Sequence, residues 1–333
     1  MSDTSITRTQ GRYTVERTLG QQLVGAFEVG IDTERGGRVT LFYPHLGDHA
    51  PAAFVDDMAG ELRRAAHLEG TAYCTVRDAG ISADGRAFVV VDRPRGTPLS
   101  AMLQTQGRLS IHRALAISVQ VSDLVQRAHQ AGIERVPVSP DAVIVDAASG
   151  GRDRVALVDL GTNRGPLARA LRSPRRPDGF SAPQADASDA ADARDDVFSV
   201  SALLFAMLFG VTPPAMSVHG PADGSGWPIL PEGGLDRRLE VCLQTVLLRG
   251  LAATREERFP RISELGRSLT GLQQLMQISA PAFELLAATR GRMGRAAPLL
   301  EVQPSDPGIQ RARQARSRIR DVVTASGEGG AQL

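Results

Sequence analysis

The stretch from Gly132 to Gly161 constrains the fold of this chain more than any other. It contains a tight loop, a strand at 143–146 (VIVD), a glycine-rich turn (AASGGRD) and a second strand at 154–158 (RVALV), which ends on Asp159-Leu160-Gly161. Two apolar strands joined by a short glycine-containing turn are typical of a β-hairpin. The apolar residues of the preceding stretch, 111–130, recur at helical spacing, so we expect a long amphipathic helix beside the hairpin.

This stretch resembles the catalytic-loop hairpin of bacterial Hanks-type serine/threonine protein kinases, where H-R-D-x-x-x-x-N precedes the first strand and D-F-G follows the second. Gly132-Ile133 matches the Gly-Ile before that motif, Pro140 matches its proline, and Asp159 to Gly161 match D-F-G. The resemblance covers roughly residues 11–275. It implies an α+β, bilobal protein-kinase-like fold, with an antiparallel five-stranded N-lobe that holds one main helix and a mainly helical C-lobe.

The residues that carry the chemistry of such kinases are missing. The H-R-D aspartate accepts the substrate hydroxyl proton, the lysine two residues on lies near the transferred phosphate, and the asparagine holds magnesium. Those positions carry Pro137, Ser139 and Ala142. The chain has 38 arginines and no lysine, and Asn163 is its single asparagine. An error in aligning the chain with the kinase motifs therefore cannot explain the missing lysine, nor supply a second asparagine.

The predicted N-lobe begins with three strands, YTVERTLG, AFEVGID and GGRVTLFYP. A phosphate-cradling G-x-G-x-x-G loop would place its glycines at Gly20, Gln22 and Gly25. A side chain at the middle position obstructs the approach of phosphates to the backbone. The alternative is that Gly20 and Gly25 are glycines of an ordinary β-turn.

Phe42 stands where the V-A-I-K lysine of the family binds ATP, since Val39 to Phe42 match that motif. An aromatic side chain buries about 150–250 Å², so we expect Phe42 to fill the cleft. Glu61, on a predicted helix that begins near Asp56, matches the glutamate that pairs with that lysine. It is either a solvated carboxylate or the partner of an arginine. Asp159 is the one candidate metal ligand.

The C-lobe retains the structural positions of the family. Asp196 matches the buried aspartate that braces the catalytic-loop backbone, and His129 at the end of the long helix is interpreted as structural. Gln184 replaces the A-P-E glutamate that pairs with an arginine, here Arg258, so we expect a hydrogen bond between them. Such a bond contributes about 1.5–3 kcal/mol.

Four segments are expected along the chain of 333 residues. These are a disordered N-terminus (1–10), the N-lobe (11–94), the C-lobe (95–275) and a tail (276–333) with a basic helix near 309–323. No stretch approaches the roughly 20 apolar residues of a membrane span, and the N-terminal residues are not apolar enough for a signal peptide. We expect a cytoplasmic protein, without a disulfide framework.

Protein partners are expected, through either of two basic segments. The activation segment carries five arginines that suit an acidic or phosphorylated partner: Arg164, Arg169, Arg172, Arg175 and Arg176. The tail helix could contact a partner or, less favourably because its apolar face is weak, a membrane surface. The alternative for both is a solvated segment. A net charge of +1 gives no reason to expect nucleic-acid binding.

The pattern favours a pseudokinase, a non-catalytic signalling or scaffolding module that binds protein partners. No cofactor is expected. An alternative is an atypical serine/threonine kinase or ATP-binding regulator in which arginines replace the missing lysine, with weak ATP binding. A third interpretation is a subunit that the tail and the arginine-rich loop hold in a larger assembly.

Overall fold

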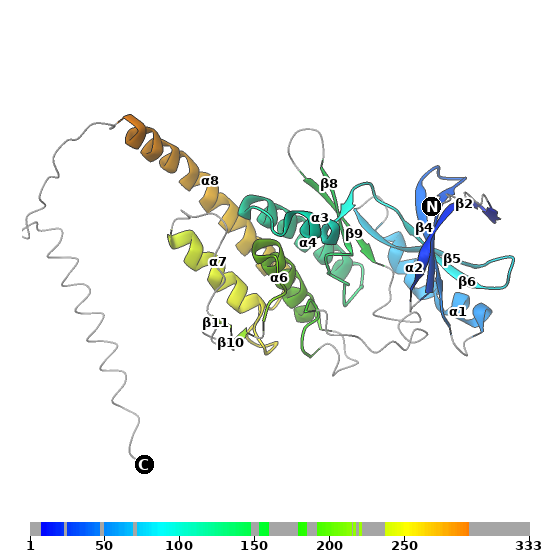
Figure 1. Cartoon of the computed structure of the whole chain (residues 1–333). Helices are drawn as coiled ribbons and strands as arrows, with labels where there is room; N and C mark the ends of the chain where they lie inside the picture. Colours follow the sequence, from blue (N-terminus) through cyan, green and yellow to red (C-terminus); the bar gives the residue numbers. More distant parts are fainter. Residues whose placement is uncertain are drawn as a thin grey trace, which may run out of the picture. The chain divides into compact units, whose positions relative to one another are not determined.

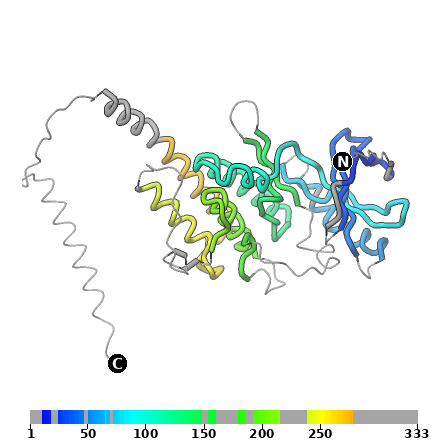
Figure 2. The backbone as a smooth tube through the Cα atoms, in the orientation of Figure 1, coloured from blue at the N-terminus to red at the C-terminus, as the bar shows by residue number. Residues whose placement is uncertain are grey.

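The computed structural model describes residues 8–22, 25–46, 50–68, 72–147, 153–159, 179–184, 192–214, 216–217, 220–221 and 237–292. The chain divides into two units, Met1–Ala280 and Pro281–Leu333, and the kinase-like fold lies in the first. Figures 1 and 2 show this unit as a β-rich lobe that carries the N-terminal strands and a helical lobe. The predicted α+β, bilobal, kinase-like fold is therefore confirmed.

The sheet of the N-lobe is antiparallel and has six strands rather than the predicted five. Their spatial order is β1 (Arg8–Gln10), β2 (Tyr13–Gln22), β3 (Gly25–Asp32), β4 (Arg38–Pro44), β6 (Ala87–Asp92) and β5 (Tyr73–Ile81). The extra strand, β1, lies in the segment expected to be disordered and pairs with β2, Gln10 opposite Tyr13. Its polar RTQ sequence has no apolar alternation, so backbone pairing alone defines it. Gly11, at φ 58°, permits the tight reversal.

Each face of this sheet is covered by a separate apolar cluster, because side chains alternate along a strand. One face packs Tyr13, Val15, Leu41, Tyr43 and Phe88 together with Val39 and Val90. The opposite face carries Phe42, Val76, Val89 and Val91, and it packs against Phe54 and Met58 from the helical segment. We call this second face, which carries Phe42 at the predicted position of the ATP lysine, the cleft face.

The helical part of the N-lobe is two short helices, not the predicted single helix starting near Asp56. They are α1 (Pro51–Asp57) and α2 (Ala59–Ala66). Proline is favoured in the first turn of a helix, so Pro51 starts α1 five residues before the predicted beginning. Phe54 and Met58 are four residues apart and both are buried against the sheet.

The predicted hairpin is confirmed and it continues the N-lobe sheet. β8 (Val143–Ala147) pairs antiparallel with β9 (Asp153–Asp159), and the short β7 (Thr97–Pro98) pairs with β8. β9 also pairs in parallel with β5, Tyr73 opposite Leu157 and Thr75 opposite Asp159. The nine strands thus form one continuous order across both lobes, and the strand that ends on Asp159 is fixed to the N-lobe.

The C-lobe is mainly helical. Its helices are α3 (Leu99–Gln106), α4 (Ile111–Gln130), α6 (Ala193–Phe209), α7 (Arg237–Gly250) and α8 (Ile262–Arg292), with a small pair of strands, β10 (Met216–Ser217) and β11 (Gly220–Pro221). α6 packs against α4 and α7, and its side chains are buried nearly all round. The predicted boundary at 275/276 falls inside α8. No helix within the described ranges is long and apolar enough to cross a membrane.

Candidate functional site

The loop after α4 keeps the backbone of a catalytic loop. The Val136 N–H lies 3.1 Å from both carboxylate oxygens of Asp196, and His129 Nε2 lies 2.7 Å from Asp196 Oδ2. These contacts confirm the predicted bracing by Asp196 and the structural role of His129. Burial raises the pKa of Asp196, and the contact with His129 opposes that shift. Arg135, at φ 58°, is the one described non-glycine residue with a positive φ, so the brace holds a strained backbone.

Pro137, Ser139 and Ala142 stand at the three positions that carry catalytic residues in kinases, and here they form part of the turn. Ser139 accepts hydrogen bonds from the Ala142 N–H, at its side-chain oxygen (3.4 Å) and at its carbonyl (3.1 Å). The carbonyl of Ala142 accepts from the Val158 N–H at 2.8 Å, which brings this position beside the end of β9. Pro137 is half-buried between the buried Val136 and Val138. The chain therefore builds the loop and supplies no proton acceptor at its Pro137 position.

Phe42, predicted to stand at the position of the ATP lysine, belongs to the apolar core of the N-lobe. Its side chain is 0% exposed, and its ring stacks on that of Phe27, with centroids 4.5 Å apart and planes 20° from parallel. Phe27 lies directly opposite Phe42 in the β3–β4 register, so the two rings share the cleft face. Ala156 and Val158 of β9 pack against the same cluster. The apolar core of the N-lobe thus extends to the strand that ends on Asp159.

Gly25 is required by this packing. A Cβ atom added there would lie 2.2 Å from the Tyr43 carbonyl oxygen and 2.6 Å from Cε2 of Phe42. Gly20 lies opposite Phe27, and Gln22 lies opposite Gly25, so two residues separate the paired ends of β2 and β3. This tight hairpin supports the alternative explanation of the glycines as turn and packing residues. The Gln22 side chain lies outside the described residues.

Glu61 has an arginine partner, and it is not a solvated carboxylate. It is 6% exposed and forms an ion pair with Arg64, three residues later on α2. Side chains three apart on a helix lie on neighbouring positions of its surface. The pair is therefore local to α2, whereas the ion pair of a kinase links this helix to the third strand of the sheet.

Asp159 is completely buried, and the Tyr73 hydroxyl donates a hydrogen bond to its Oδ2. Tyr73 and Asp159 lie on the two strands that pair in parallel, β5 and β9. This hydrogen bond ties the Asp159 carboxylate to the N-lobe strand β5. Within the described residues, no group of three or more His, Cys, Asp or Glu side chains could hold a metal ion.

Known proteins resemble this chain in both sequence and fold, although no family model matches it. It is 27% identical over 261 residues to the serine/threonine-protein kinase PknE of Mycobacterium tuberculosis, covering 77% of this chain and 45% of PknE. It is 28% identical over 139 residues to PknA of the same organism, covering 40% of this chain and 32% of PknA. The chain thus spans less than half the length of these relatives.

Crystal structures of the Mycobacterium tuberculosis PknI kinase domain have the same fold. One superposes with a TM-score of 0.58 at 23% identity, covering 82% of this chain and 100% of that domain. The sequence relationship and the fold agree with the motifs. The chain thus resembles bacterial serine/threonine protein kinases in sequence and has the fold of a protein kinase domain.

The C-lobe brace of this kinase-like chain differs in one respect from the prediction. Arg258 Nη2 donates to Gln184 Oε1 at 2.7 Å, as predicted. Arg258 Nη1 also lies 3.2 Å from Asp195 Oδ1, and Arg255 binds the same carboxylate through two nitrogens, at 2.7 and 2.8 Å. Asp195 therefore supplies the negative charge that Gln184 lacks. The sequence interpretation had given Asp195 no role.

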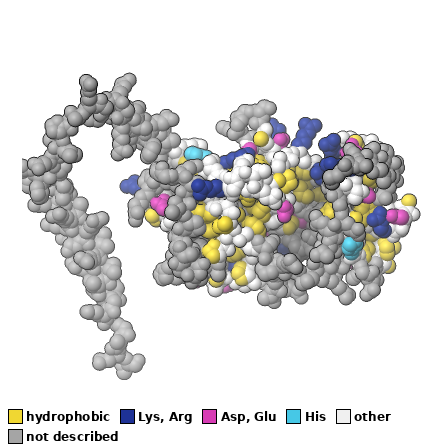
Figure 3. Space-filling view, viewed as in Figure 1, with side chains coloured by type: hydrophobic (Ala, Val, Ile, Leu, Met, Phe, Trp, Pro, Cys, Tyr) yellow, Lys and Arg dark blue, Asp and Glu magenta, His cyan; other side chains and the backbone are white. Residues whose placement is uncertain are grey.

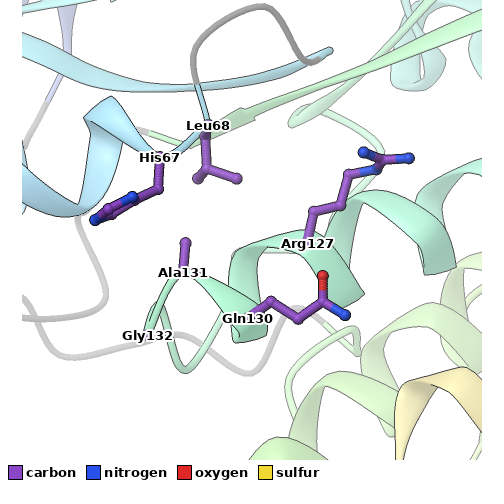
Figure 4. A pocket seen from close by; sticks show the side chains of 6 residues that line it. All are labelled: His67, Leu68, Arg127, Gln130, Ala131 and Gly132. Atoms are coloured by element: carbon purple, nitrogen blue, oxygen red, sulfur yellow. The ribbon is translucent and has the colours of Figure 1, made fainter.

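A surface pocket of about 480 Å³ lies between the residues that follow α2 and the end of α4 (Figure 4). It is lined by the residues after α2 and by the end of α4: His67, Leu68, Arg127, Gln130, Ala131 and Gly132. In Figure 4 the side chains of Arg127 and His67 point in different directions. Arg127 pairs with Asp123 at 2.9 Å. None of the predicted cleft residues lines this pocket.

Two groups of predicted partner residues lie outside the described residues. These are the activation-segment arginines, Arg164, Arg169, Arg172, Arg175 and Arg176, and the tail helix near 309–323. Within the described cleft, sequence reasoning missed Phe27, Tyr73 and Arg64. The position of Phe27 opposite Phe42 follows from counting the hairpin register. No sequence signal pairs Tyr73 with Asp159, because that contact depends on a parallel pairing of distant strands.

Proposed function

We propose that this chain is a pseudokinase, a non-catalytic signalling or scaffolding module that binds protein partners and needs no cofactor. The observation that carries the proposal is Phe42, a fully buried ring stacked on Phe27 where the family places its ATP lysine. The chain contains no lysine that could act from another position. A cytoplasmic location stays a prediction of the sequence.

The loss extends to each step of phosphoryl transfer. That reaction depends on positioning the phosphates and stabilising their charge, with a metal ion bridging them and a carboxylate orienting the nucleophile. Pro137 and Ala142 have neither a carboxylate nor an amide, and the carboxylate of Asp159 accepts a hydrogen bond from Tyr73. General-base catalysis alone is worth about 10²–10⁴-fold in rate. Losing metal ligation and positioning as well leaves negligible transfer.

The alternative is an atypical kinase or ATP-binding regulator in which arginine replaces the lysine. Arg64 does take the place of lysine as the partner of Glu61. It comes from α2 itself, however, so it does not reproduce a cation that projects from β4 between phosphate and glutamate. This observation favours the scaffold over the atypical enzyme.

A thermal-shift titration with ATP, with and without Mg²⁺ or Mn²⁺, tests the proposal. We expect no metal-dependent rise in the melting temperature at millimolar ATP. A saturable, metal-dependent rise that disappears in Asp159→Ala would favour the atypical enzyme instead. A pull-down from the native host, compared between the unaltered chain and Asp159→Ala, tests the scaffold role. We expect the same partners with both.

A further inference from the structure

The sheet face that carries the stacked phenylalanines also carries a group of basic side chains. The Arg93 N–H donates to the Arg38 carbonyl at 2.9 Å, which continues the β4–β6 pairing by one residue and puts Arg93 opposite Arg38. Arg17 lies opposite Val29, and Val29 lies opposite Thr40. We call Arg17, Arg38 and Arg93 the arginine cluster.

The register places this cluster and Phe42 on the same face. Residues directly opposite each other in an antiparallel sheet share a face, and so do residues two apart on one strand. Arg38, Thr40 and Phe42 are spaced by two along β4, so all three share the cleft face. Arg93 lies on the same face because it is opposite Arg38, and Arg17 does because it is opposite Val29, which is itself opposite Thr40. The cleft face thus has an aromatic part and, next to the connection between the lobes, a cationic part.

The charges of the arginine cluster are only partly balanced. Arg38 Nε lies 3.9 Å from Glu16, and the Arg38 side chain is 70% exposed. Arg93 Nη1 lies 3.5 Å from the Thr40 hydroxyl oxygen. Among the residues that the structure describes, no carboxylate lies within ion-pair distance of Arg17 or Arg93. The pKa of Arg93 is lowered mainly by partial burial and also by repulsion from the positive charges of Arg17 and Arg38. A bound anion would relieve this repulsion.

We propose that the arginine cluster, with the Thr40 hydroxyl, binds a phosphoryl group. The planar guanidinium forms paired hydrogen bonds with phosphate oxygens, and a phosphomonoester offers three acceptor oxygens and close to two negative charges. The group can be presented by a phosphorylated serine or threonine of a protein or by a nucleotide. This inference goes beyond the proposed function, because binding a phosphoryl group does not require transferring one.

In Figure 3 the basic side chains on the viewed face form several small groups rather than one broad surface. A set of separated charges does not match the regular spacing of phosphates along a nucleic acid, which basic stripes bind. A compact anion is the better match to three arginines that share one face of the sheet, on β2, on β4 and directly after β6.

Calorimetric titration of the full chain at low salt tests the site, with N-acetyl phosphothreonine amide and with metal-free ADP as probes. The unphosphorylated threonine amide is the ligand control. We expect at least one phosphorylated probe to bind, and Arg17→Gln and Arg93→Gln each to weaken its binding about tenfold or more. Arg108→Gln, an exposed arginine in the connection between α3 and α4, is the matched control and should bind as the unaltered chain does.

Binding of the phosphothreonine probe alone would assign the site to a phosphorylated protein, and binding of ADP alone would assign it to a nucleotide. Arg93→Lys, which keeps the charge but loses the paired hydrogen bonds, should lie between the unaltered chain and Arg93→Gln. Circular dichroism of each variant separates lost binding from lost folding. Failure of both probes to bind, or equal binding by folded Arg93→Gln, would overturn the inference. Neither result bears on whether the chain transfers phosphate.

Discussion

The Tyr73 hydroxyl donates a hydrogen bond to the Asp159 carboxylate across the parallel strands β5 and β9. Tyr73 is 3% exposed and Asp159 is 0% exposed, so the pair is withdrawn from water. It joins the N-lobe to the strand that carries the D-L-G motif. We interpret Asp159, the one retained residue of the nucleotide chemistry, as a structural residue that holds the two lobes in register.

Tyr73→Phe should lower the free energy of unfolding by about 1–3 kcal/mol, because it removes a hydroxyl donor from a buried carboxylate. Asp159→Asn keeps an acceptor for Tyr73 and should cost less than Asp159→Ala. Urea denaturation of the three variants measures these differences. Equal stability of Asp159→Ala and the unaltered chain would show that the hydrogen bond is not structural.

Phe42→Ala should destabilise the N-lobe by about 3–5 kcal/mol, because it leaves a cavity under the ring of Phe27. Phe42→Leu, which keeps most of the apolar volume, should cost less. Phe42→Lys restores the family residue, but it buries an ammonium group among apolar side chains, so we expect loss of stability without gain of ATP binding. Denaturation and a thermal-shift titration with ATP measure the two effects. A stable Phe42→Lys variant that binds ATP would contradict the filled cleft.

Asp195→Ala should be the most destabilising change in the C-lobe brace, by about 3–5 kcal/mol. The Arg258 side chain is 0% exposed, so losing this carboxylate leaves a buried guanidinium without its counter-charge. Gln184→Ala removes a neutral acceptor only and should cost less. If Gln184→Ala proved the more damaging of the two in urea denaturation, Asp195 would not be the compensating residue.

Asp192 provides a pH-dependent contribution to stability at the start of α6. Its carboxylate accepts from the Arg194 backbone N–H at 2.9 Å and from the Arg194 guanidinium, which lowers its pKa from 3.8 to about 2. A lowered pKa means that the contribution is present above about pH 4 and is lost as the pH falls toward 2. Asp192→Ala should therefore cost about 1–2 kcal/mol at neutral pH. The difference between variant and unaltered chain should shrink on acidification, and a constant difference would contradict the assignment.

The two cysteines should differ sharply in reactivity. Burial raises the pKa of Cys74 to about 12, whereas Cys242 is exposed on α7. The thiolate is the reactive form, so a colorimetric thiol reagent at pH 8 should modify one thiol quickly and the second only on unfolding. Cys242→Ser should have no fast thiol. Because Cys74 belongs to the same apolar cluster as Phe42, a fast Cys74 reaction would indicate an open cleft.

The sequence predicted the parts of the fold that depend on local pattern. Alternating apolar residues placed the strands from Tyr13 onward, and helical spacing placed α4. The polar β1 and the start of α1 at Pro51 were missed, because apolar periodicity does not mark either. The loss of kinase chemistry stays a prediction, and it depends on the absence of residue types from the sequence rather than on geometry. The contacts Tyr73–Asp159 and Asp195–Arg258 join distant segments, so only the folded chain reveals them.

Transfer of label from radioactive ATP tests the central claim most directly. The purified chain is incubated with labelled ATP and Mg²⁺ or Mn²⁺, with and without a general protein substrate, beside Asp159→Ala. We predict no label above that of Asp159→Ala on either protein. Label that accumulates with the unaltered chain and vanishes in a correctly folded Asp159→Ala variant would contradict the account.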